Sequence, residues 1–542
     1  MSGFINVLML TGSLFMMQVY DRVLGSQSVP TLVALSLIAM AAYSFQGLLD
    51  ALRARLLALI GERIDEVVGP KVFAALADLP LRLPRGMQET LQPFRDLDAV
   101  RTFLAGQGPL ALFDLPWLPV YLVVMFLLHP LLGWLTVAGA VVLIGLTVLT
   151  EFRSRKSGLA ALHAVSVRNQ TADATQRNAE AVRAMGMLPA LAARWQQLHD
   201  AQMQAQRQAS FSIGSLSVAA RAFRMILQSA MLGLGAYLSI RNQISTGTII
   251  AASILGSRAL APIDLAIGSW RGFQAARQGH QRLKKLMELY PDKPPVFSLV
   301  APRSALSVDQ MTLSAPGSRE PIVKRVSFAL HAGQALGIIG SSASGKTSLG
   351  RGLVGIWTPL AGRVTLDGAG LDQWEPSVLG QSIGYLPQDV QLFDGTLAEN
   401  IARFQPEAPS EAVVEAAVAA GFHPFAVAFE KGYATRIGQG GAQLSAGQRQ
   451  RIGLARALYG KPFLVVLDEP NSNLDGDGEA AVVNAILGVR KRNGIAVVIA
   501  HRPSVMGAVD MLLLMRNGEM AAFGPRDEIL QKLAQNARKV IP

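Results

Sequence analysis

Long stretches without a charged residue are the feature that most limits how this chain can fold. A helix needs about 20 mostly apolar residues to cross a bilayer. Charge-free stretches occur at Met1–Tyr20, Pro30–Leu49, Leu115–Thr150, Met225–Ile240 and Asn242–Ser257. The third is long enough for two spans, and His129-Pro130 marks a turn between them. The sequence therefore predicts six membrane-spanning helices in its first half.

The first stretch has an alternative interpretation, which is a secretory signal peptide. A signal peptide begins with a basic segment and ends at small residues before its cleavage site. Met1–Tyr20 contains no Lys or Arg, and Asp21-Arg22 follow it directly. We therefore interpret this stretch as the first span.

Basic residues are concentrated in two loops between the predicted spans. Residues 50–104 carry eight Lys and Arg and residues 151–224 carry ten, whereas each other loop carries one or none. Loops rich in Lys and Arg stay in the cytoplasm, so both long loops and both termini are predicted to be cytoplasmic. Their composition, rich in Ala, Gln, Arg and Leu, predicts helices that continue the spans beyond the bilayer.

Two charged residues, Arg258 and Asp264, lie within or at the end of the sixth apolar stretch. A charge in hydrocarbon is costly and normally faces the interior of a bundle or an aqueous cavity. These residues therefore either line a transport path or lie near a membrane interface. Asp114, directly before Leu115, is predicted at the cytoplasmic mouth of the third span.

A change in composition indicates where the membrane domain ends. A basic helix around residues 271–285 gives way to a linker with Pro291, Pro294 and Pro295, and proline breaks helices. We place the boundary near Phe297, which predicts a membrane domain at 1–296 and a second domain at 297–542.

The distribution of charge excludes a soluble ATPase that binds nucleic acid. Residues 1–302 hold 27 Lys and Arg against 17 Asp and Glu, whereas residues 303–542 hold 23 against 21. A nucleic-acid-binding domain carries a basic stripe on its folded surface, but here the excess lies in the apolar half, where membrane lipids explain it. The chain has no cysteine, which excludes a cysteine nucleophile and a thiolate metal site.

A glycine- and serine-rich segment after the short apolar strand Ala335–Ile339 predicts a phosphate-binding loop. Its residues are Gly340, Ser341, Ser342, Ala343, Ser344, Gly345, Lys346 and Thr347, and Ser348 opens a predicted helix that ends at Val354. The glycines let backbone N–H groups surround phosphate oxygens at the positive end of the helix. Lys346 is predicted to reach the β- and γ-phosphates of ATP, and the Thr347 hydroxyl to hold Mg²⁺.

Polar residues also follow two further predicted strands. Phe463–Leu467 is followed by Asp468, which can hold Mg²⁺ opposite Thr347, and by Glu469, which can orient and polarise the attacking water. Ile495–Ala500 is followed by His501. Paired acids can simply end a strand in solvent, but open α/β sheets bind ligands at the carboxyl ends of their strands. The coincidence of three such strands favours an ATP site.

A second potential anion-binding site precedes the predicted helix Gln448–Tyr459. Ser445 and Gly447 open this helix, so its first backbone N–H groups can face an anion. One nucleotide does not need two such sites from one chain. If two chains meet head to tail, each second site covers the γ-phosphate held by the other chain, which predicts that ATP joins a dimer.

Together these motifs resemble those of the ABC transporter superfamily, and the resemblance covers the whole chain. Gly340–Thr347 resembles Walker A, Leu464–Asp468 Walker B, Leu444–Gln448 the signature sequence, Gln388 the Q-loop glutamine, Ser472–Asp475 the D-loop and His501 the switch histidine. The resemblance implies a six-span α-helical exporter domain followed by an α/β P-loop ATPase domain, assembled as a homodimer or close heterodimer.

The resemblance also implies roles for individual residues. Gln388 would sense Mg²⁺ and the γ-phosphate, Glu469 would be the catalytic base, and His501 would contact the γ-phosphate. Ser445, Gly447 and Gln448 would act on the ATP of the partner subunit. One departure is Ser314–Gly317, which lacks the aromatic residue that stacks on adenine in many exporters.

Three segments resemble type I secretion permease-ATPases, in the branch that exports alkaline proteases and RTX proteins. They are Met17–Val23, Phe113–Trp117 and Glu469–Asp475. The resemblance implies a bacterial inner-membrane protein with a cytoplasmic ATPase domain, a periplasmic membrane fusion protein and an outer-membrane channel as partners, and unfolded protein substrates with a C-terminal signal. Without cysteine, no cysteine protease domain is present to clip leaders from bacteriocins.

Two other functions remain open at this point. One is an exporter of lipids or hydrophobic small molecules with the same architecture. The other is a membrane-anchored regulatory ATPase that transports nothing, against which Glu469, Arg258 and Asp264 speak. For a transporter, we expect the cytoplasmic extensions near residues 85–105 and 171–186 to carry motion from the ATPase domain to the spans.

Overall fold

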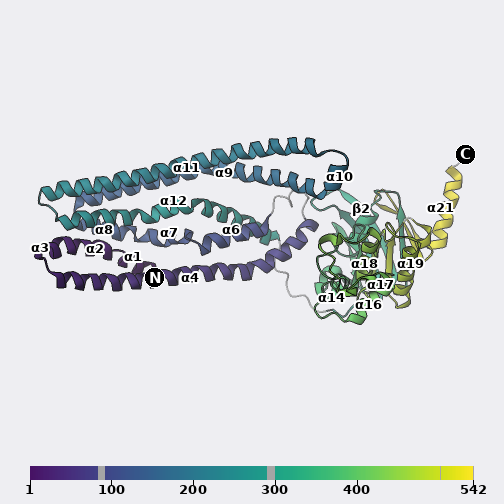
Figure 1. Cartoon of the computed structure of the whole chain (residues 1–542). Helices are drawn as coiled ribbons and strands as arrows, with labels where there is room; N and C mark the ends of the chain where they lie inside the picture. Colours follow the sequence, from purple (N-terminus) through teal and green to yellow (C-terminus); the bar gives the residue numbers. More distant parts are fainter. Residues whose placement is uncertain (83–91, 290–298, 501, 541–542) are drawn as a thin grey trace. The chain divides into compact units, whose positions relative to one another are not determined.

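The computed structural model describes residues 1–82, 92–289, 299–500 and 502–540. The chain divides into two compact units (Figure 1). Unit 1 comprises residues 1–78 and 85–291, and unit 2 comprises residues 79–84 and 292–542. The predicted domain boundary near Phe297 lies outside the described residues.

Unit 1 is entirely helical over its described residues. Its elements are α1 (Ser2–Leu8), α2 (Thr11–Gln18), the π-helical turn η1 (Val19–Val23), α3 (Leu24–Ser26), α4 (Val29–Arg82), α6 (Pro93–Ala105), α7 (Gly108–Asp114), η2 (Leu115–Trp117), α8 (Leu118–Leu128), α9 (Pro130–Arg177), α10 (Ala179–Ala184), α11 (Leu188–Ile240) and α12 (Thr246–Leu289). Among the described residues, six helical segments are long and apolar enough to cross a membrane. The prediction of six spans is confirmed.

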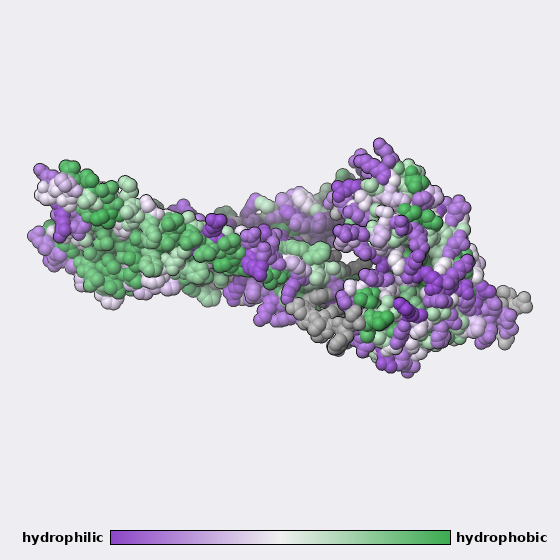
Figure 2. Space-filling model, turned by 90° about the horizontal axis from the view of Figure 1, so that it is seen from below, coloured by the Kyte–Doolittle hydropathy of each residue, from purple (hydrophilic) through white to green (hydrophobic). Residues whose placement is uncertain are grey.

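Four of these helices are far longer than a bilayer requires. Helices α4, α9, α11 and α12 contain 54, 48, 53 and 44 residues. At about 1.5 Å per residue, a helix of about 50 residues is roughly 75 Å long, against a hydrocarbon core of about 30 Å. These helices are therefore long enough for the predicted extensions beyond the bilayer, which stay a prediction. Hydrophobic side chains gather over the end of unit 1 that carries α2 and α3, as Figure 2 shows.

The third span is assembled from short pieces, and prolines mark where they begin. Pro109, Pro116 and Pro119 occupy the first turns of α7, η2 and α8. Proline has no N–H to donate, so it is tolerated in a first turn but breaks a helix interior. The sequence placed the start of this span at Leu115, whereas the apolar segment begins at Gly108.

The end of the first span is tied to the start of the sixth by Asp21, which lies in η1. Its carboxylate accepts hydrogen bonds from the Ser245 hydroxyl at 2.6 Å and from the Gly247 N–H at 2.9 Å. The first N–H groups of a helix have no partner within the helix, so Asp21 caps α12. A Cβ at Gly247 would lie 2.7 Å from the Asp21 carboxylate, which explains the glycine.

Asp114 is buried and joins the first three spans. Its Oδ1 accepts a hydrogen bond from Arg53 of α4 at 2.9 Å and from Asn6 of α1 at 3.0 Å. The Tyr121 hydroxyl of α8 donates to the Asn6 carbonyl at 2.9 Å, and Arg53 also pairs with Asp50 at 3.0 Å. Buried charges persist only when they are paired, so this network fixes the three spans to one another.

Asp264 has a different environment from Asp114. It forms an ion pair with Arg224 of α11, and both residues line a cavity of about 1030 Å³ between α6, α11 and α12. Arg258 is exposed on α12. The cavity is compatible with the predicted position on a transport path, which stays a prediction.

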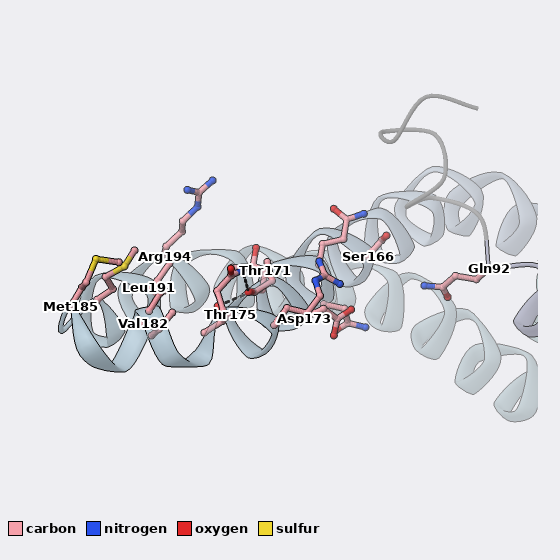
Figure 3. A pocket seen from close by; sticks show the side chains of 16 residues that line it. Gln92, Ser166, Thr171, Asp173, Thr175, Val182, Met185, Leu191 and Arg194 are labelled. Carbon is pink, nitrogen blue, oxygen red and sulfur yellow. Dashed lines mark hydrogen bonds between the residues drawn. The ribbon is translucent and has the colours of Figure 1, made fainter. Parts of the chain in front are cut away.

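The short helix α10 connects α9 to α11 at the tip of the second extension. The tip encloses a pocket of about 650 Å³, lined by polar side chains of α9 such as Asp173 and Thr175 and by Val182 and Leu191 (Figure 3). Met185 at this tip is 67% exposed. The predicted segment 171–186 thus consists of helix and a turn with an exposed apolar side chain. Part of the other predicted segment, 85–105, lies outside the described residues, because residues 83–91 are not described.

Unit 2 contains two β-sheets with helices. Its strands are β1 (Ala305–Ser314), β2 (Pro321–His331), β3 (Ala335–Gly340), β4 (Ala361–Leu366), β5 (Ala369–Gly370), β6 (Ile383–Leu386), β7 (Leu464–Asp468), β8 (Ile495–Ile499), β9 (Met511–Arg516) and β10 (Glu519–Pro525). Its helices are α13 (Lys346–Leu353), η3 (Leu371–Gln373), α14 (Pro376–Ser382), α15 (Leu397–Ile401), α16 (Ser410–Ala419), α17 (His423–Ala428), η4 (Gly432–Ala434), η5 (Gln439–Gly441), α18 (Ala446–Leu458), α19 (Gly476–Lys491), α20 (Pro503–Met506) and α21 (Arg526–Val540).

The larger sheet places the ends of the predicted strands side by side. Its order is β10-β9-β3-β8-β7-β6, and all neighbouring strands are parallel except β10, which is antiparallel to β9; the smaller antiparallel sheet has the order β2-β1-β4-β5. In β7, Leu464 and Val466 pack into a core with the smaller sheet and α13, while Val465 and Leu467 pack into a core with α16, α18 and α19. Because both faces are buried, the strand is a continuous apolar run. The three predicted strands are confirmed within one residue at each end.

We predict that replacing Asp114 with alanine destabilises unit 1 by about 3 kcal/mol, since Arg53 then keeps only Asp50 as a carboxylate partner among the described residues and the buried Asn6 amide loses an acceptor. The measurement is thermal unfolding of the detergent-solubilised protein. A matched control is Glu66→Ala, because Glu66 pairs with Arg63 on the exposed face of α4, where both side chains are more than half exposed. Equal unfolding temperatures for the two variants would contradict the structural role of Asp114.

Candidate nucleotide-binding site

The loop between β3 and α13 has the shape of a phosphate cradle. Gly345, the N-cap of α13, has φ of +95°, and no side chain caps the helix. A Cβ at Gly340 would lie 2.3 Å from the Met515 carbonyl oxygen, so only glycine fits beneath the loop. Ser341, Ser342 and Ala343 are exposed. The first N–H groups of α13 are therefore left for a ligand anion.

The Lys346 side chain is held at this loop by backbone carbonyl oxygens. Its Nζ donates to the carbonyl oxygens of Gly340 at 2.9 Å and Ser341 at 2.8 Å. Burial lowers the pKa of its ammonium group below the usual value, while the nearby carboxylates of Glu469 and Asp468 act in the opposite direction. An anion that enters the loop would replace these carbonyl oxygens as the partner of the Lys346 ammonium group.

Thr347 and Asp468 come together as predicted for two metal-holding residues. The Thr347 hydroxyl donates to Asp468 Oδ1 at 3.3 Å, and Asp468 Oδ2 is buried and has no hydrogen-bond partner within the described part of the chain. Burial raises the pKa of the Asp468 carboxyl to about 6. A hard cation prefers oxygen ligands and would give this buried oxygen its missing partner, so the donor set fits Mg²⁺.

The two remaining predicted side chains of the sheet edge also meet. Gln388, which follows β6, donates its Nε2 to Glu469 Oε2 at 3.2 Å. Glu469 has a positive φ of +48°, and its backbone N–H bonds the Ile499 carbonyl at 2.9 Å. A non-glycine residue in the left-handed region is unusual and common at functional sites. His501, predicted at the same edge, lies outside the described residues.

Ser445, Gly447 and Gln448 gather at the start of α18, which begins two residues earlier than predicted. Ser445 Oγ accepts from the Gln448 N–H at 3.2 Å, and Gln448 Oε1 accepts from the Ser445 N–H at 2.9 Å. This is a capping box, and it leaves the Ser445 hydroxyl proton free to donate. Ser445 is exposed, so that hydroxyl is accessible to an anion from outside.

Two side chains that follow the signature sequence, Gln450 and Arg451, were not singled out from the sequence. Gln450 Nε2 donates to the Pro470 carbonyl at 3.2 Å, and Arg451 Nη2 bonds Asp475 Oδ1 at 2.5 Å. The same Asp475 oxygen caps α19 by accepting from the Gly478 N–H at 2.9 Å. Both side chains are at most 6% exposed. Two polar residues at positions of the amphipathic helix that face the core are the sequence signal that could have found them.

The segment Ser314–Gly317, which contains no aromatic residue, lies at the end of β1. Ser314 ends the strand, and Ala315 packs against the core between the two sheets. An adenine ring would therefore meet small side chains here.

Comparisons with known proteins agree with this fold. Residues 2–257 match the family described as the ABC transporter transmembrane region, and residues 323–472 match the family described as ABC transporter. The solved structure of a bacterial Atm1-family ABC exporter with ATP bound aligns with a TM-score of 0.84 and 23% identity, over 100% of this chain and 98% of that one. At that identity the likeness shows the fold alone.

Sequence relatives place the chain more narrowly. It is 48% identical to the type I secretion system ATP-binding protein PrsD of Rhizobium meliloti, over 100% of this chain and 94% of the relative. It is 30% identical to the leukotoxin translocation ATP-binding protein LktB of Mannheimia haemolytica, over 98% of this chain and 75% of the relative. The chain belongs to the ABC transporters. Within them it is a type I secretion permease/ATPase, a multi-pass membrane protein that couples ATP hydrolysis to transport.

We predict that Lys346→Ala lowers the affinity for ATP at least tenfold, because charge-assisted contacts of this kind contribute about 1.5–3 kcal/mol. Equilibrium binding of a fluorescent ATP analogue measures the effect. Lys324→Ala is the matched control, since Lys324 is exposed on β2. Binding as tight as that of the control would contradict the assignment of the loop.

Proposed function

We propose that this chain forms a homodimer in a bacterial inner membrane and exports unfolded proteins through a type I secretion system. Its ATPase domain faces the cytoplasm, and its partners are a periplasmic membrane fusion protein and an outer-membrane channel. The substrates carry a C-terminal signal, as in the alkaline-protease and RTX branch. The observation that carries the proposal is the full-length 48% identity to a type I secretion ATP-binding protein.

The two helix N-termini of unit 2 support the homodimeric part of the proposal. The start of α13 lacks a side-chain cap, whereas the start of α18 presents the exposed Ser445. In the proposed dimer the two chains meet head to tail, so that Ser445, Gly447 and Gln448 of one chain contact the γ-phosphate of the ATP held by the other. ATP then completes each site only when both chains are present.

Each site residue has a proposed part in hydrolysis. Backbone N–H groups of Ser341–Ser348 and the Lys346 ammonium hold the phosphates. Thr347, Asp468 and Gln388 would hold Mg²⁺, which supplies charge neutralisation between the β- and γ-phosphates when bound. Glu469 accepts a proton from the attacking water, and His501 contacts the γ-phosphate. The segments near residues 85–105 and 171–186 carry the resulting motion to the spans.

We predict that Glu469→Gln binds ATP, accumulates as a closed dimer and stops secretion, because the amide cannot accept the proton of the attacking water. Loss of a positioned base typically costs 10²–10⁴-fold in rate. Steady-state ATPase assays measure the loss of turnover, and size-exclusion chromatography with ATP measures the closed dimer. Glu320→Gln, in the loop before β2, is the control; turnover of the Glu469 variant near that of this control would refute the role.

Deleting the gene tests the substrate class. We expect a polypeptide to disappear from the culture medium and to return when the wild-type chain, but not the Glu469→Gln variant, is supplied. Mass spectrometry of the medium measures this, and the missing polypeptide should carry its signal at the C-terminus. An unchanged medium, together with ATPase activity stimulated by lipids or hydrophobic amines, would instead favour the small-molecule exporter.

A further inference from the structure

Unit 2 contains a cavity away from the nucleotide site. It has a volume of about 630 Å³ and lies between α16 and α19, within the range of sites that bind small molecules. Small residues form most of its wall, among them Ala412 and Ala416 of α16 and Ala481, Ala485 and Gly488 of α19. Among the described residues that line it, none belongs to the phosphate loop, the strand end at Asp468 or the signature sequence.

One cationic side chain of this cavity has an unpaired nitrogen. Arg492 follows the last turn of α19, and its Nη2 is buried without a hydrogen-bond partner among the described residues. A carboxylate of the same cavity, Glu415, attracts the guanidinium but already forms an ion pair with Lys461 at 2.7 Å. A buried donor without an acceptor costs free energy that a bound acceptor would recover. The wall thus consists mostly of small apolar residues, with the polar side chains of Asp477 and Asn484 beside them, and Arg492 offers an unpaired donor to an anion.

We propose that this cavity binds a small organic anion, with an apolar body against α16 and α19 and one carboxylate on Arg492. A guanidinium matches the planar geometry of a carboxylate and can hold it through two parallel hydrogen bonds. The small side chains of the wall leave room for a flat ring. The charge of Glu415 stays neutralised by Lys461, so it does not repel the ligand.

The helix that forms this wall also connects to the hydrolysis machinery. At its N-terminus, Asp475 caps α19 and bonds Arg451 of α18. One turn further, Glu479 pairs with Arg502 and accepts a hydrogen bond from the Ser504 hydroxyl at 2.9 Å. Ligand binding shifts α19 between these contacts and so changes the rate of ATP hydrolysis.

The chain offers a variant that fills the cavity without straining the fold. A Cβ added to Gly488 would meet nothing within 4 Å, and glycine in a helix interior is less favourable than other residues. Gly488→Phe therefore occupies the cavity with a ring while α19 stays intact. Arg492→Met removes the guanidinium and keeps an apolar stem, and Arg363→Met on the exposed face of β4 is its matched control.

The test uses the full-length protein in lipid nanodiscs with 2-naphthoate as the probe. Saturation-transfer NMR measures binding, with empty nanodiscs and the neutral 2-naphthamide as references for partition into lipid. We expect 2-naphthoate to bind the wild type and the Arg363→Met variant, at least about tenfold more weakly to Arg492→Met, and not detectably to Gly488→Phe. Equal binding to all four proteins, or no binding beyond empty nanodiscs, overturns the proposed site.

ATP hydrolysis by the same samples tests the connection through α19. We expect 2-naphthoate to change the turnover of the wild type and of Arg363→Met, and to leave that of Gly488→Phe unchanged. Binding without any change in turnover overturns the connection. Binding does not need hydrolysis or secretion, so a failure of this proposal is distinguishable from a failure of the proposed export function.

Discussion

A helix cannot satisfy its own first backbone N–H groups, and the nucleotide chemistry of this chain depends on that constraint. At α13 the groups are left open, because the N-cap is Gly345 and no side chain bonds them. At α18 the Ser445 and Gln448 side chains form a capping box, which fixes the serine hydroxyl at an exposed position. The N-terminus of α13 can thus bind an anion through its backbone N–H groups, and the N-terminus of α18 presents a fixed hydroxyl donor. The two are suited to opposite sides of one phosphate group, which α13 would hold and α18 would contact.

The two sites are not independent within the chain. Gln450 and Arg451 on the buried face of α18 bond the Pro470 carbonyl and Asp475, and both partners belong to the segment that follows the Asp468-Glu469 pair. Gly447 approaches this segment closely, since a Cβ there would lie 3.0 Å from the Asn473 carbonyl oxygen. A displacement of the signature helix is therefore transmitted to the carboxylates at the end of β7 by direct contacts with the segment that follows them, of which the Gln450 hydrogen bond to the Pro470 carbonyl is buried.

Much of this arrangement was predictable because the chemistry is local in sequence. Charge-free stretches specify spans, and apolar runs followed by polar residues specify the strand ends that gather Lys346, Thr347, Asp468 and Glu469. The breaks of the third span were not predicted, because Pro109 starts a helix inside a run that reads as loop. The Arg451–Asp475 pair was missed for another reason: its two residues are 24 positions apart, and only the packing of α18 on α19 brings them together.

Polar residues of the membrane domain show most clearly what sequence alone leaves open. Asp114 and Asp264 are both single carboxylates beside apolar runs, yet Asp114 bonds Arg53 and Asn6 from two other spans, whereas Asp264 pairs with Arg224 at a cavity. A fully paired, buried carboxylate resists any motion that separates its partners, because each would be left uncompensated in a low dielectric. In an ion pair at the wall of a cavity, each charged group can exchange its partner for water at little cost in free energy. The network at Asp114 therefore resists separation of the first three spans, whereas the pair of Arg224 and Asp264 joins α11 to α12 only at the wall of a cavity and adds no net charge to it.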